Sequence, residues 1–309
     1  FYHQSTLDLL QGLSCSVGLR YDYEHARCDF SKVQQPLNGN GETKSLEQFN
    51  RSLHFGQFTP RFSMQYLSSH NQLFYASVSK GYKAGGFNVS FLNNDDYLYS
   101  PEYNWNYEIG TKLSFLNNRL SADLSLFYID WRNQQITNTI PTVGNVIRNA
   151  GRSRNKGIEA SFQARPTKSW MMYMNYGYTD ARFVHYQKEE RGILKDYEGN
   201  YLPMVPRHTF SLTTGYSFYD ICSWIDRLTL NAGVSVTGPI YWYEDNQAKQ
   251  SPYALVNLRI SINKGCFTWE VWSKNLTNTD YLSYYFVTSK AYAQKGKPIT
   301  LGTSVSISL

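Results

Sequence analysis

The chain has 309 residues, 16% of them aromatic, yet its mean hydropathy of −0.49 is too low for a helical membrane protein. Its longest uninterrupted apolar run, 170–174, has about five residues, whereas a membrane-spanning helix needs about 20. The 30 basic and 24 acidic residues are interleaved along the chain rather than gathered in a stripe, which argues against a nucleic-acid partner.

Apolar and polar residues alternate with a period of two from end to end, which predicts an all-β protein because successive strand side chains point to opposite faces. Many of the predicted strands exceed the length of about five or six residues typical of globular sheets. Such length suits tilted strands that cross a bilayer and project beyond it. We therefore predict an antiparallel transmembrane β-barrel with about thirteen strands in this chain, at 1–8, 13–30, 51–68, 72–89, 103–116, 119–137, 145–165, 168–187, 201–219, 226–243, 250–264, 266–276 and 299–309.

The alternation assigns a face to each strand residue. In the strand predicted at 119–137, we expect Ser121, Asp123 and Ser125 to face the lumen, because a charge on the lipid face at the bilayer midplane costs about 2 to 4 kcal/mol. The residues expected to face lipid are Leu120, Ala122, Leu124, Leu126 and Tyr128.

The predicted connections alternate in length. Short turns alternate with long polar loops along the chain. The turns are at 69–71, 117–118, 165–168 and 264–265, and the loops are at about 31–50, 90–102, 188–200 and 277–298. Outer-membrane barrels show this asymmetry, with tight periplasmic turns and long external loops. Aromatic residues near the strand ends, such as Tyr97, Tyr99, 241–243 and 284–286, suit either an interfacial girdle or ordinary cross-strand packing.

Cysteine and histidine residues indicate no metal site and no cofactor. Cys15, Cys28, Cys222 and Cys266 form no CxxC pair and have no metal-ligand spacing, although a disulfide between Cys222 and Cys266 is compatible with the sequence. The six histidines are scattered, and there is no GxSxG, HExxH or P-loop motif, so the sequence does not support an enzyme. An outer-membrane lipase or protease remains an alternative.

Several segments, taken in order, resemble the C-terminal barrel of TonB-dependent outer-membrane receptors of the siderophore-receptor type. The most specific is 73–88 (LFYASVSKGYKAGGFN), which follows 59–63 (TPRFS). The resemblance covers essentially the whole chain, 1–309, which we interpret as one barrel portion. Further matches are 107–112 (YEIGTK), 126–130 (LFYID), 149–151 (NAG), 156–159 (KGIE), 205–208 (VPRH), 274–278 (KNLTN) with Tyr281, and 296–298 (GKP).

The resemblance implies a 22-stranded barrel whose lumen holds an N-terminal plug that engages TonB. This chain contains about thirteen of those strands and no plug, and Phe1 begins within a strand, so we expect the plug and the targeting segment upstream. The last strand resembles the signal read by the barrel-assembly machinery, although it ends on Leu309 where Phe or Trp is usual. The implied location is the bacterial outer membrane, in contact with its lipid.

The function implied by the resemblance is active uptake of a scarce nutrient, most simply a ferric siderophore. Haem and cobalamin receptors of the same family, and a passive porin or adhesin barrel, are the alternatives. Exposed loops on a rigid scaffold carry binding residues, so we expect capture by loops at 82–100, 188–200, 241–250 and 277–298. The candidate ligand-binding residues are aromatic rings for stacking and arginines for attracting an anionic complex: Tyr82, Phe87, Tyr241, Trp242, Tyr284, Tyr285, Arg148, Arg152 and Arg154.

Overall fold

The computed structural model describes residues 1–35, 42–91, 94–140, 143–149, 151–190, 193–287 and 290–308. Within these residues almost all regular structure is antiparallel strand, and the one helical element is a 3-10 turn, η1 (Asn94–Tyr97). No helix in these ranges is long and apolar enough to cross a membrane.

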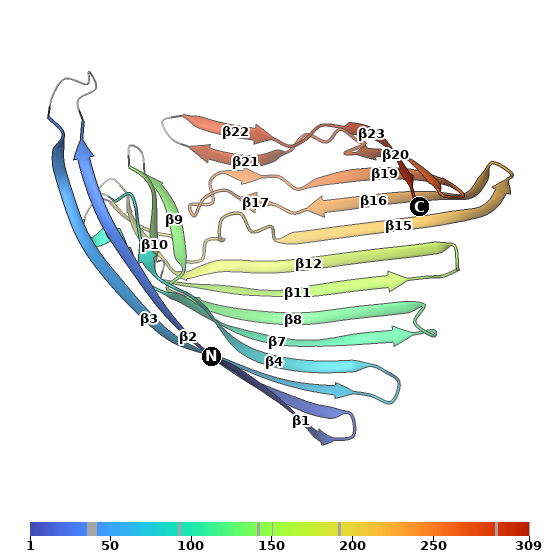
Figure 1. The fold of residues 1–309 in the computed structure, drawn as a ribbon, viewed down its shortest axis with the longest axis horizontal. Helices are drawn as coiled ribbons and strands as arrows, with labels where there is room; N and C mark the ends of the chain where they lie inside the picture. Colours follow the sequence, from blue (N-terminus) through green and yellow to red (C-terminus); the bar gives the residue numbers. More distant parts are fainter. Residues whose placement is uncertain are drawn as a thin grey trace.

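Thirteen strands form one antiparallel sheet in which each strand pairs with the next along the chain, so the predicted all-β fold and the number of main strands are confirmed. Figure 1 shows the sheet curved into an open trough, with β1 and β23 at its two edges. The strands are β1 (Tyr2–Leu10), β2 (Leu13–Gln34), β3 (Lys44–Leu67), β4 (Leu73–Lys83), β7 (Glu102–Phe115), β8 (Leu120–Arg132), β11 (Arg152–Ala164), β12 (Trp170–His185), β15 (His208–Cys222), β16 (Ile225–Thr237), β19 (Tyr253–Lys264), β20 (Phe267–Lys274) and β23 (Thr300–Ile307).

The connections alternate in length, as predicted, and the long ones carry small hairpins of their own. In Figure 1 these hairpins gather at one end of the trough, which we call the hairpin end, whereas short turns lie at the opposite turn end. The paired strands are β5 (Gly86–Phe87) with β6 (Leu98–Tyr99), β9 (Gln135–Ile140) with β10 (Gly144–Asn149), β13 (Gln187–Glu190) with β14 (Ile193–Asp196), β17 (Ile240–Tyr241) with β18 (Lys249–Gln250), and β21 (Leu282–Val287) with β22 (Ala291–Lys295).

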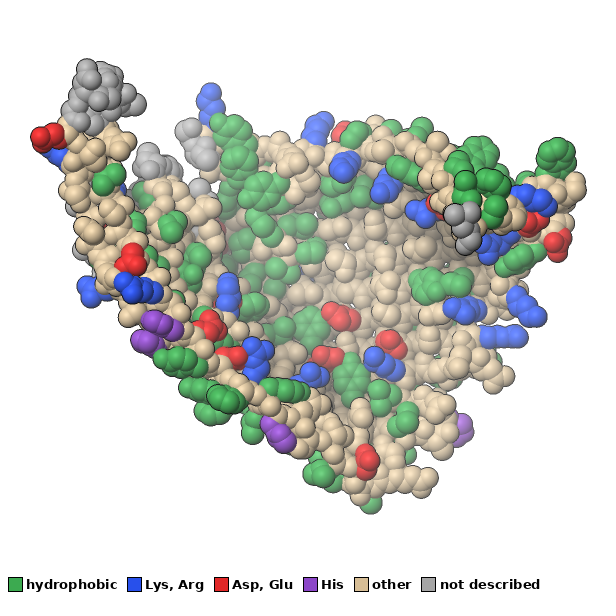
Figure 2. Space-filling view, viewed as in Figure 1, with side chains coloured by type: hydrophobic (Ala, Val, Ile, Leu, Met, Phe, Trp, Pro, Cys, Tyr) green, Lys and Arg blue, Asp and Glu red, His purple; other side chains and the backbone are tan. Residues whose placement is uncertain are grey.

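The two faces of the sheet differ in polarity. Cross-strand register joins Leu126 to Ile109 and Ile158 on one face and Ser125 to Gly110 and Glu159 on the other. Figure 2 looks into the concave side, where few apolar side chains cover the middle of the sheet. The side chains of Leu124, Leu126 and Tyr128 are exposed on the convex face, and Lys112 lies opposite Asp123 on the concave face. The expected alternation in β8 is therefore present.

The predicted strands at 72–89, 119–137, 145–165, 201–219 and 226–243 ran too far, and local backbone features explain the ends of three of them. β4 ends before Gly85, where a Cβ atom would lie 2.4 Å from the carbonyl oxygen of Tyr99. β8 ends before Asn133, which has a φ of 51°. β15 begins only at His208, because Pro203 and Pro206 lack the N–H that a sheet ladder needs.

Other sequence predictions need correction or lie outside the described residues. The loop expected at 31–50 is shorter, since β2 extends to Gln34 and β3 begins at Lys44, and 36–41 are not described. The long connection 133–151 was not anticipated. The four cysteines are free thiols, so Cys222 and Cys266 are not joined. Ala150 and Leu309, both named in the motif comparison, lie outside the described residues.

Single cysteines placed at Leu124 and Ser125 in a cysteine-free, full-length protein test the assignment of the faces. Leu124→Cys should be protected from a charged, water-soluble maleimide in membranes, because its side chain lies on the apolar convex face, whereas Ser125→Cys should react. Asp123→Cys serves as a second concave-face probe, and total labelling after denaturation corrects for expression. Protection of Asp123→Cys together with reaction of Leu124→Cys would reverse the register.

Candidate functional site

The connections at the hairpin end are fastened to one another by side-chain hydrogen bonds. Asn88, which follows β5, is buried and joins its connection to β10: its amide donates to the carbonyl of Ile147 at 2.8 Å and accepts from the backbone N of Ile147 at 2.8 Å. Arg148 and Asp96 form a two-point ion pair at 2.8 and 2.6 Å between the same segments. The connections 84–101 and 133–151 therefore form one unit.

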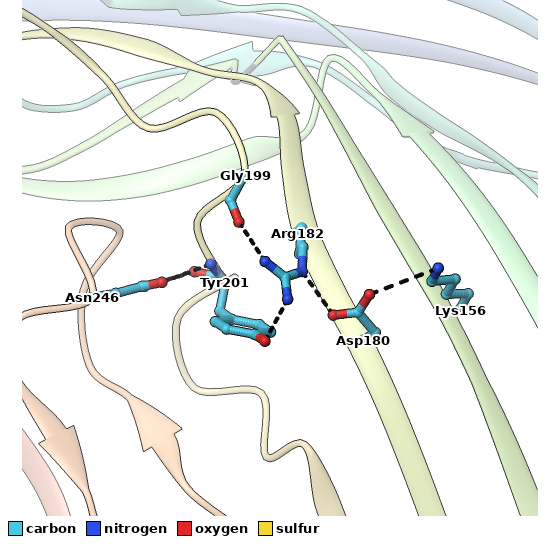
Figure 3. A network of polar contacts seen from close by, with 6 residues as sticks. All are labelled: Lys156, Asp180, Arg182, Gly199, Tyr201 and Asn246. Carbon is cyan, nitrogen blue, oxygen red and sulfur yellow. Dashed lines mark hydrogen bonds and ion pairs between the residues drawn. The ribbon is translucent and has the colours of Figure 1, made fainter.

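A second unit joins the connections 186–207 and 238–252. The side chain of Asn246 accepts from the backbone N of Tyr201 at 2.7 Å and donates to the carbonyl of Tyr201 at 2.9 Å (Figure 3). Nearby, Lys188 donates to the buried carboxylate of Glu244 at 2.6 Å, and Asn200 donates to the carbonyl of Glu244 at 2.9 Å. A reciprocal pair of bonds from one side chain fixes both the spacing and the direction of the two segments.

The connection 275–299 attaches to the same unit. The backbone N of Leu282 donates to Gln250 Oε1 at 2.8 Å, and the backbone N of Val287 donates to the hydroxyl of Tyr243 at 2.6 Å. Three consecutive long connections thus form a continuous surface at the hairpin end.

An apolar cluster supports this surface from below. It contains Ala181, Phe183, Tyr186, Tyr197 and Leu202, with Ile136 and Val205 packed against it. Phe183 is only 1% exposed. Because a single sheet has no second layer, its side chains are buried chiefly where connections fold over it, and this cluster is where that happens.

Tyr201 links the connections to the sheet. It forms an isolated bridge with Arg182 of β12, whose guanidinium lies 4.0 Å from the centre of the Tyr201 ring, and the Arg207 guanidinium lies 4.8 Å from the same ring. Arg182 is itself held by Asp180 at 2.8 Å and by the carbonyl of Gly199 at 3.0 Å (Figure 3). Tyr241 stacks on Tyr201 with ring centres 5.5 Å apart.

The aromatic side chains of the last two connections form a second group, which we call the Trp242 cluster: Trp242, Tyr243, Tyr284 and Tyr285. The Trp242 ring packs edge-on against Tyr284 and at a tilt against Tyr285, with ring centres 6.4 Å apart in both pairs. Trp242 is 5% exposed, and its indole N–H has no hydrogen-bond partner among the described residues. Because this N–H is itself shielded from solvent, the part of the cluster open to a ligand is the ring of Tyr284, which is 43% exposed.

The structure brings some of the ligand-binding candidates predicted from the sequence together and places others apart. Trp242, Tyr284 and Tyr285 come together, whereas Tyr241 stacks on Tyr201. Tyr82 is the last residue but one of β4 and has a buried hydroxyl, Phe87 lies in β5, and Arg148 is neutralised by Asp96. Arg152 and Arg154 belong to β11, where register places Arg154 opposite Asp130 on the face that carries Leu126 and Ile158.

Sequence reasoning missed several residues that hold the surface together, namely Tyr201, Glu244, Asn246 and Lys188. Tyr243 was noted only as part of an aromatic run. No local pattern distinguishes Asn246 from any other turn asparagine, because its partner lies 45 positions away. Among the described residues, no group of three or more His, Cys, Asp or Glu side chains is placed to hold a metal ion.

Asp196 is the clearest acid-sensitive group outside the main sheet. Its carboxylate accepts from the backbone N of Glu198 at 2.9 Å and from Gln187 at 3.1 Å, and these bonds hold its pKa below the ordinary value of 3.8. A bond to the charged form stabilises that form. The carboxylate therefore helps to close the β13–β14 hairpin while it is ionised.

Replacing Asn246 tests the joint between the two connections. Asn246→Gly keeps the left-handed backbone (φ 55°) but removes both bonds to Tyr201, which should make local opening about 5- to 150-fold more frequent, since each bond contributes about 0.5 to 1.5 kcal/mol. Hydrogen exchange in 193–207 and 238–252 measures this. Gln247→Gly, at the exposed neighbouring position, is the control. Equal protection in both variants would contradict the assigned role.

Acidification should open the β13–β14 hairpin before the main sheet is affected. Because the pKa of Asp196 is lowered in the folded protein, its contribution to stability is present above about pH 3.8 and is lost as pH falls through the lower folded pKa. Hydrogen exchange of 193–200, corrected for intrinsic rates, should accelerate as pH falls below about 3.8. The acceleration should be absent in Asp196→Asn, and an identical pH dependence in that variant would assign the effect elsewhere.

The chain is similar in sequence to known proteins. The family model described as "TonB dependent receptor-like, beta-barrel" matches residues 1–278. The pesticin receptor of Yersinia pestis is 24% identical over 99% of this chain and 43% of its own length. The probable TonB-dependent siderophore receptor PiuA of Acinetobacter baumannii is 26% identical over 72% of this chain and 30% of its own length.

Among solved structures, the ferric yersiniabactin uptake receptor FyuA from Yersinia pestis superposes with a TM-score of 0.82 at 21% identity, covering 99% of this chain and 44% of that one. At this identity the likeness shows the fold alone. The chain spans less than half the length of these relatives. The family model covers most of the sequence, and the chain therefore belongs to the TonB-dependent receptor β-barrel family.

Proposed function

We propose that the protein to which this chain belongs takes up a ferric siderophore across the bacterial outer membrane, driven through TonB, and that it carries out no catalysis. Family membership supports the TonB-dependent part of the proposal. The relatives named as receptors for pesticin and for siderophores, and the uptake receptor for ferric yersiniabactin, support a siderophore as the ligand.

The observation that carries the proposal is the Trp242 cluster on three mutually fastened connections. Flat aromatic faces offer stacking to a partly aromatic ferric complex. Lys290 and Lys297, exposed in the same connection as Tyr284, add positive charge for an anionic complex. Holding the connections together before binding reduces the entropy lost on capture.

In this proposal the hairpin end faces the outside and the short turns face the periplasm, as the lengths of the connections favour. The remaining strands of a 22-stranded barrel pair with β1 and β23, and the barrel-assembly machinery reads the last strand. A plug and its TonB-engaging segment belong to the part of the protein upstream of this chain.

Uptake of radiolabelled iron by a deletion strain complemented with the full-length gene tests the function. We expect uptake that requires both a ferric siderophore and a functional TonB system. Equal uptake without TonB would favour a passive barrel. Growth on haem iron, or on cobalamin, without siderophore uptake would move the proposal to those ligands.

Replacing Tyr241, Trp242, Tyr284 and Tyr285 together by alanine should weaken binding of the ferric siderophore at least tenfold, because stacking surface is lost. That factor corresponds to about 1.4 kcal/mol. Titration of the purified full-length protein measures it. Barrel yield should not change, since these residues lie outside the main sheet. Leucine at the convex-face residues Tyr107, Tyr128, Tyr176 and Tyr216 is the control. Unchanged affinity in the alanine variant would move the site to another part of the protein.

A further inference from the structure

The concave side of the sheet carries a hollow of about 570 Å³ at the turn end, at the opposite end of the strands from the Trp242 cluster. We call it the turn-end hollow. Figure 2 shows basic side chains along this end of the concave side. The cations that line the hollow are Arg119, Arg165, Lys168 and Arg227.

Strand register places the hollow on the concave face. Glu159, a concave-face residue of β11, pairs with Gly177 of β12, and Gly177 pairs with Thr209 of β15. Residues of β15 that lie an even number of positions from Thr209 share this face. Tyr219 is one of them, and it pairs with Arg227 of β16. The tyrosine ring and the guanidinium therefore belong to the same side of the sheet.

The turn between β11 and β12 brings the other three cations together. The backbone N of Arg165 donates to the carbonyl of Arg119 at 2.7 Å, so these two residues lie side by side. Lys168 follows in the same turn. A bond of 2.9 Å from the backbone N of Ser217 to the carbonyl of Ser169 fastens this turn to β15. Backbone hydrogen bonds thus determine where these cations lie.

No carboxylate balances these charges within the part of the chain that the structure describes. The lining of the hollow contains no Asp or Glu. Arg119, Arg165 and Lys168 form no ion pair with a described residue. Arg227 donates to a neutral partner, Asn263 Oδ1, at 3.2 Å. A concave surface lined by charges of one sign concentrates ions of the opposite sign, so the hollow attracts anions.

The rest of the lining suits a small, oxygen-rich ligand. Hydroxyl and amide side chains offer hydrogen bonds, and the rings of Tyr173 and Tyr219, 39% and 53% exposed, offer stacking surface. Ligand pockets commonly measure about 300 to 1,000 Å³, and the hollow falls within that range. The polar uncharged side chains of the lining are Thr167, Ser169, Thr213, Ser217, Thr229 and Asn231.

A strip of small side chains leads from the hairpin end to the hollow. Along this strip, the concave-face residues of β15 and β16 are all serine, threonine, glycine or asparagine. No charged or bulky side chain of these two strands interrupts the strip, so the wall leaves room for a ligand that moves along it. The strip consists of Thr209, Ser211, Thr213, Gly215 and Ser217 of β15, paired with Thr237, Ser235, Gly233, Asn231 and Thr229 of β16.

We infer that the turn-end hollow is a second, weaker binding site for the anionic ferric complex, at the end of the lumen where the complex leaves for the periplasm. This inference rests on the proposed function. All four cations are exposed, so solvent and salt screen their attraction, and the hollow attracts the complex without retaining it. It stays empty at ligand concentrations that saturate only the stronger site at the Trp242 cluster.

The test is a titration of the purified full-length protein with a ferric tris-catecholate complex, which is trianionic. The ferric tris-acetohydroxamate complex, which is neutral, is the uncharged probe. Arg119→Gln with Arg165→Gln removes two cations from the hollow, and Arg119→Lys with Arg165→Lys keeps the charge as a matched control. The quadruple alanine variant of the Trp242 cluster separates the two sites.

The glutamine variant should bind the trianionic complex at the weaker site at least tenfold more weakly than the wild type. The reason is that a unit charge about 4 Å from an opposite charge contributes roughly fivefold in affinity even in water. The lysine variant should stay within about twofold, because its charges are unchanged. The neutral complex should not distinguish the three proteins, and the quadruple alanine variant should keep the weaker site.

Two outcomes would overturn the inference. One is equal binding of the trianionic complex by the wild type and the glutamine variant. The other is faster hydrogen exchange upstream of this chain in the glutamine variant with no change in catecholate binding, which would assign the hollow to an upstream segment. If the double variant does not fold, Lys168→Gln replaces it, with an expected loss of about fivefold.

Uptake of radiolabelled ferric siderophore by cells that carry the same variants separates this inference from the proposed function. A weaker site that depends on Arg119 and Arg165, in a protein that supports no siderophore uptake, would reject the proposed function alone. Siderophore uptake by a protein without such a site would reject this inference alone.

Discussion

The structure depends on one constraint: in a single-layer sheet, the backbone polar groups of each strand find partners only on the two neighbouring strands. Thirteen consecutive strands satisfy one another in this way, and the antiparallel meander follows because short turns join neighbours directly. The same pairing forces side chains to alternate between the faces. One face can then be apolar and the other polar without any core, which explains how an aromatic-rich chain keeps a low mean hydropathy.

Stability at the hairpin end has a different origin. The connections there have few ladder partners, so they are held by single side chains that bridge segments distant in the sequence, such as Asn88, Asn246 and Gln250. These bridges convert separate loops into two units over a small apolar cluster. The proposed ligand surface is built on this arrangement.

The sequence was sufficient to predict the features that depend on the two-residue alternation and on the order of strands and connections. The number of main strands, the faces of β8 and the alternation of connection lengths all follow from alternating residues. Strand ends were predicted poorly, because they depend on local backbone features such as the left-handed Asn133 and on close approaches such as that at Gly85.

The side-chain bridges were beyond prediction for a different reason. The partner of Asn246 is a backbone 45 residues away, and no periodic signal encodes that pairing. Arg154 is an instructive case. It lies four residues before Ile158, and strand residues an even number of positions apart share a face, so the sequence already placed it on the face of Ile158. Its positive charge suggested a ligand role, whereas the face on which it lies argues against that role.

Hydrogen exchange of the full-length protein, with and without a ferric siderophore, tests most directly whether the hairpin end captures ligand. Binding should slow exchange in 193–207, 238–252 and 275–287, where the fastened connections and the Trp242 cluster lie, and should leave the short turns at 116–119, 165–169 and 223–224 unchanged. Saturating ligand that protects none of the three connections would contradict the account.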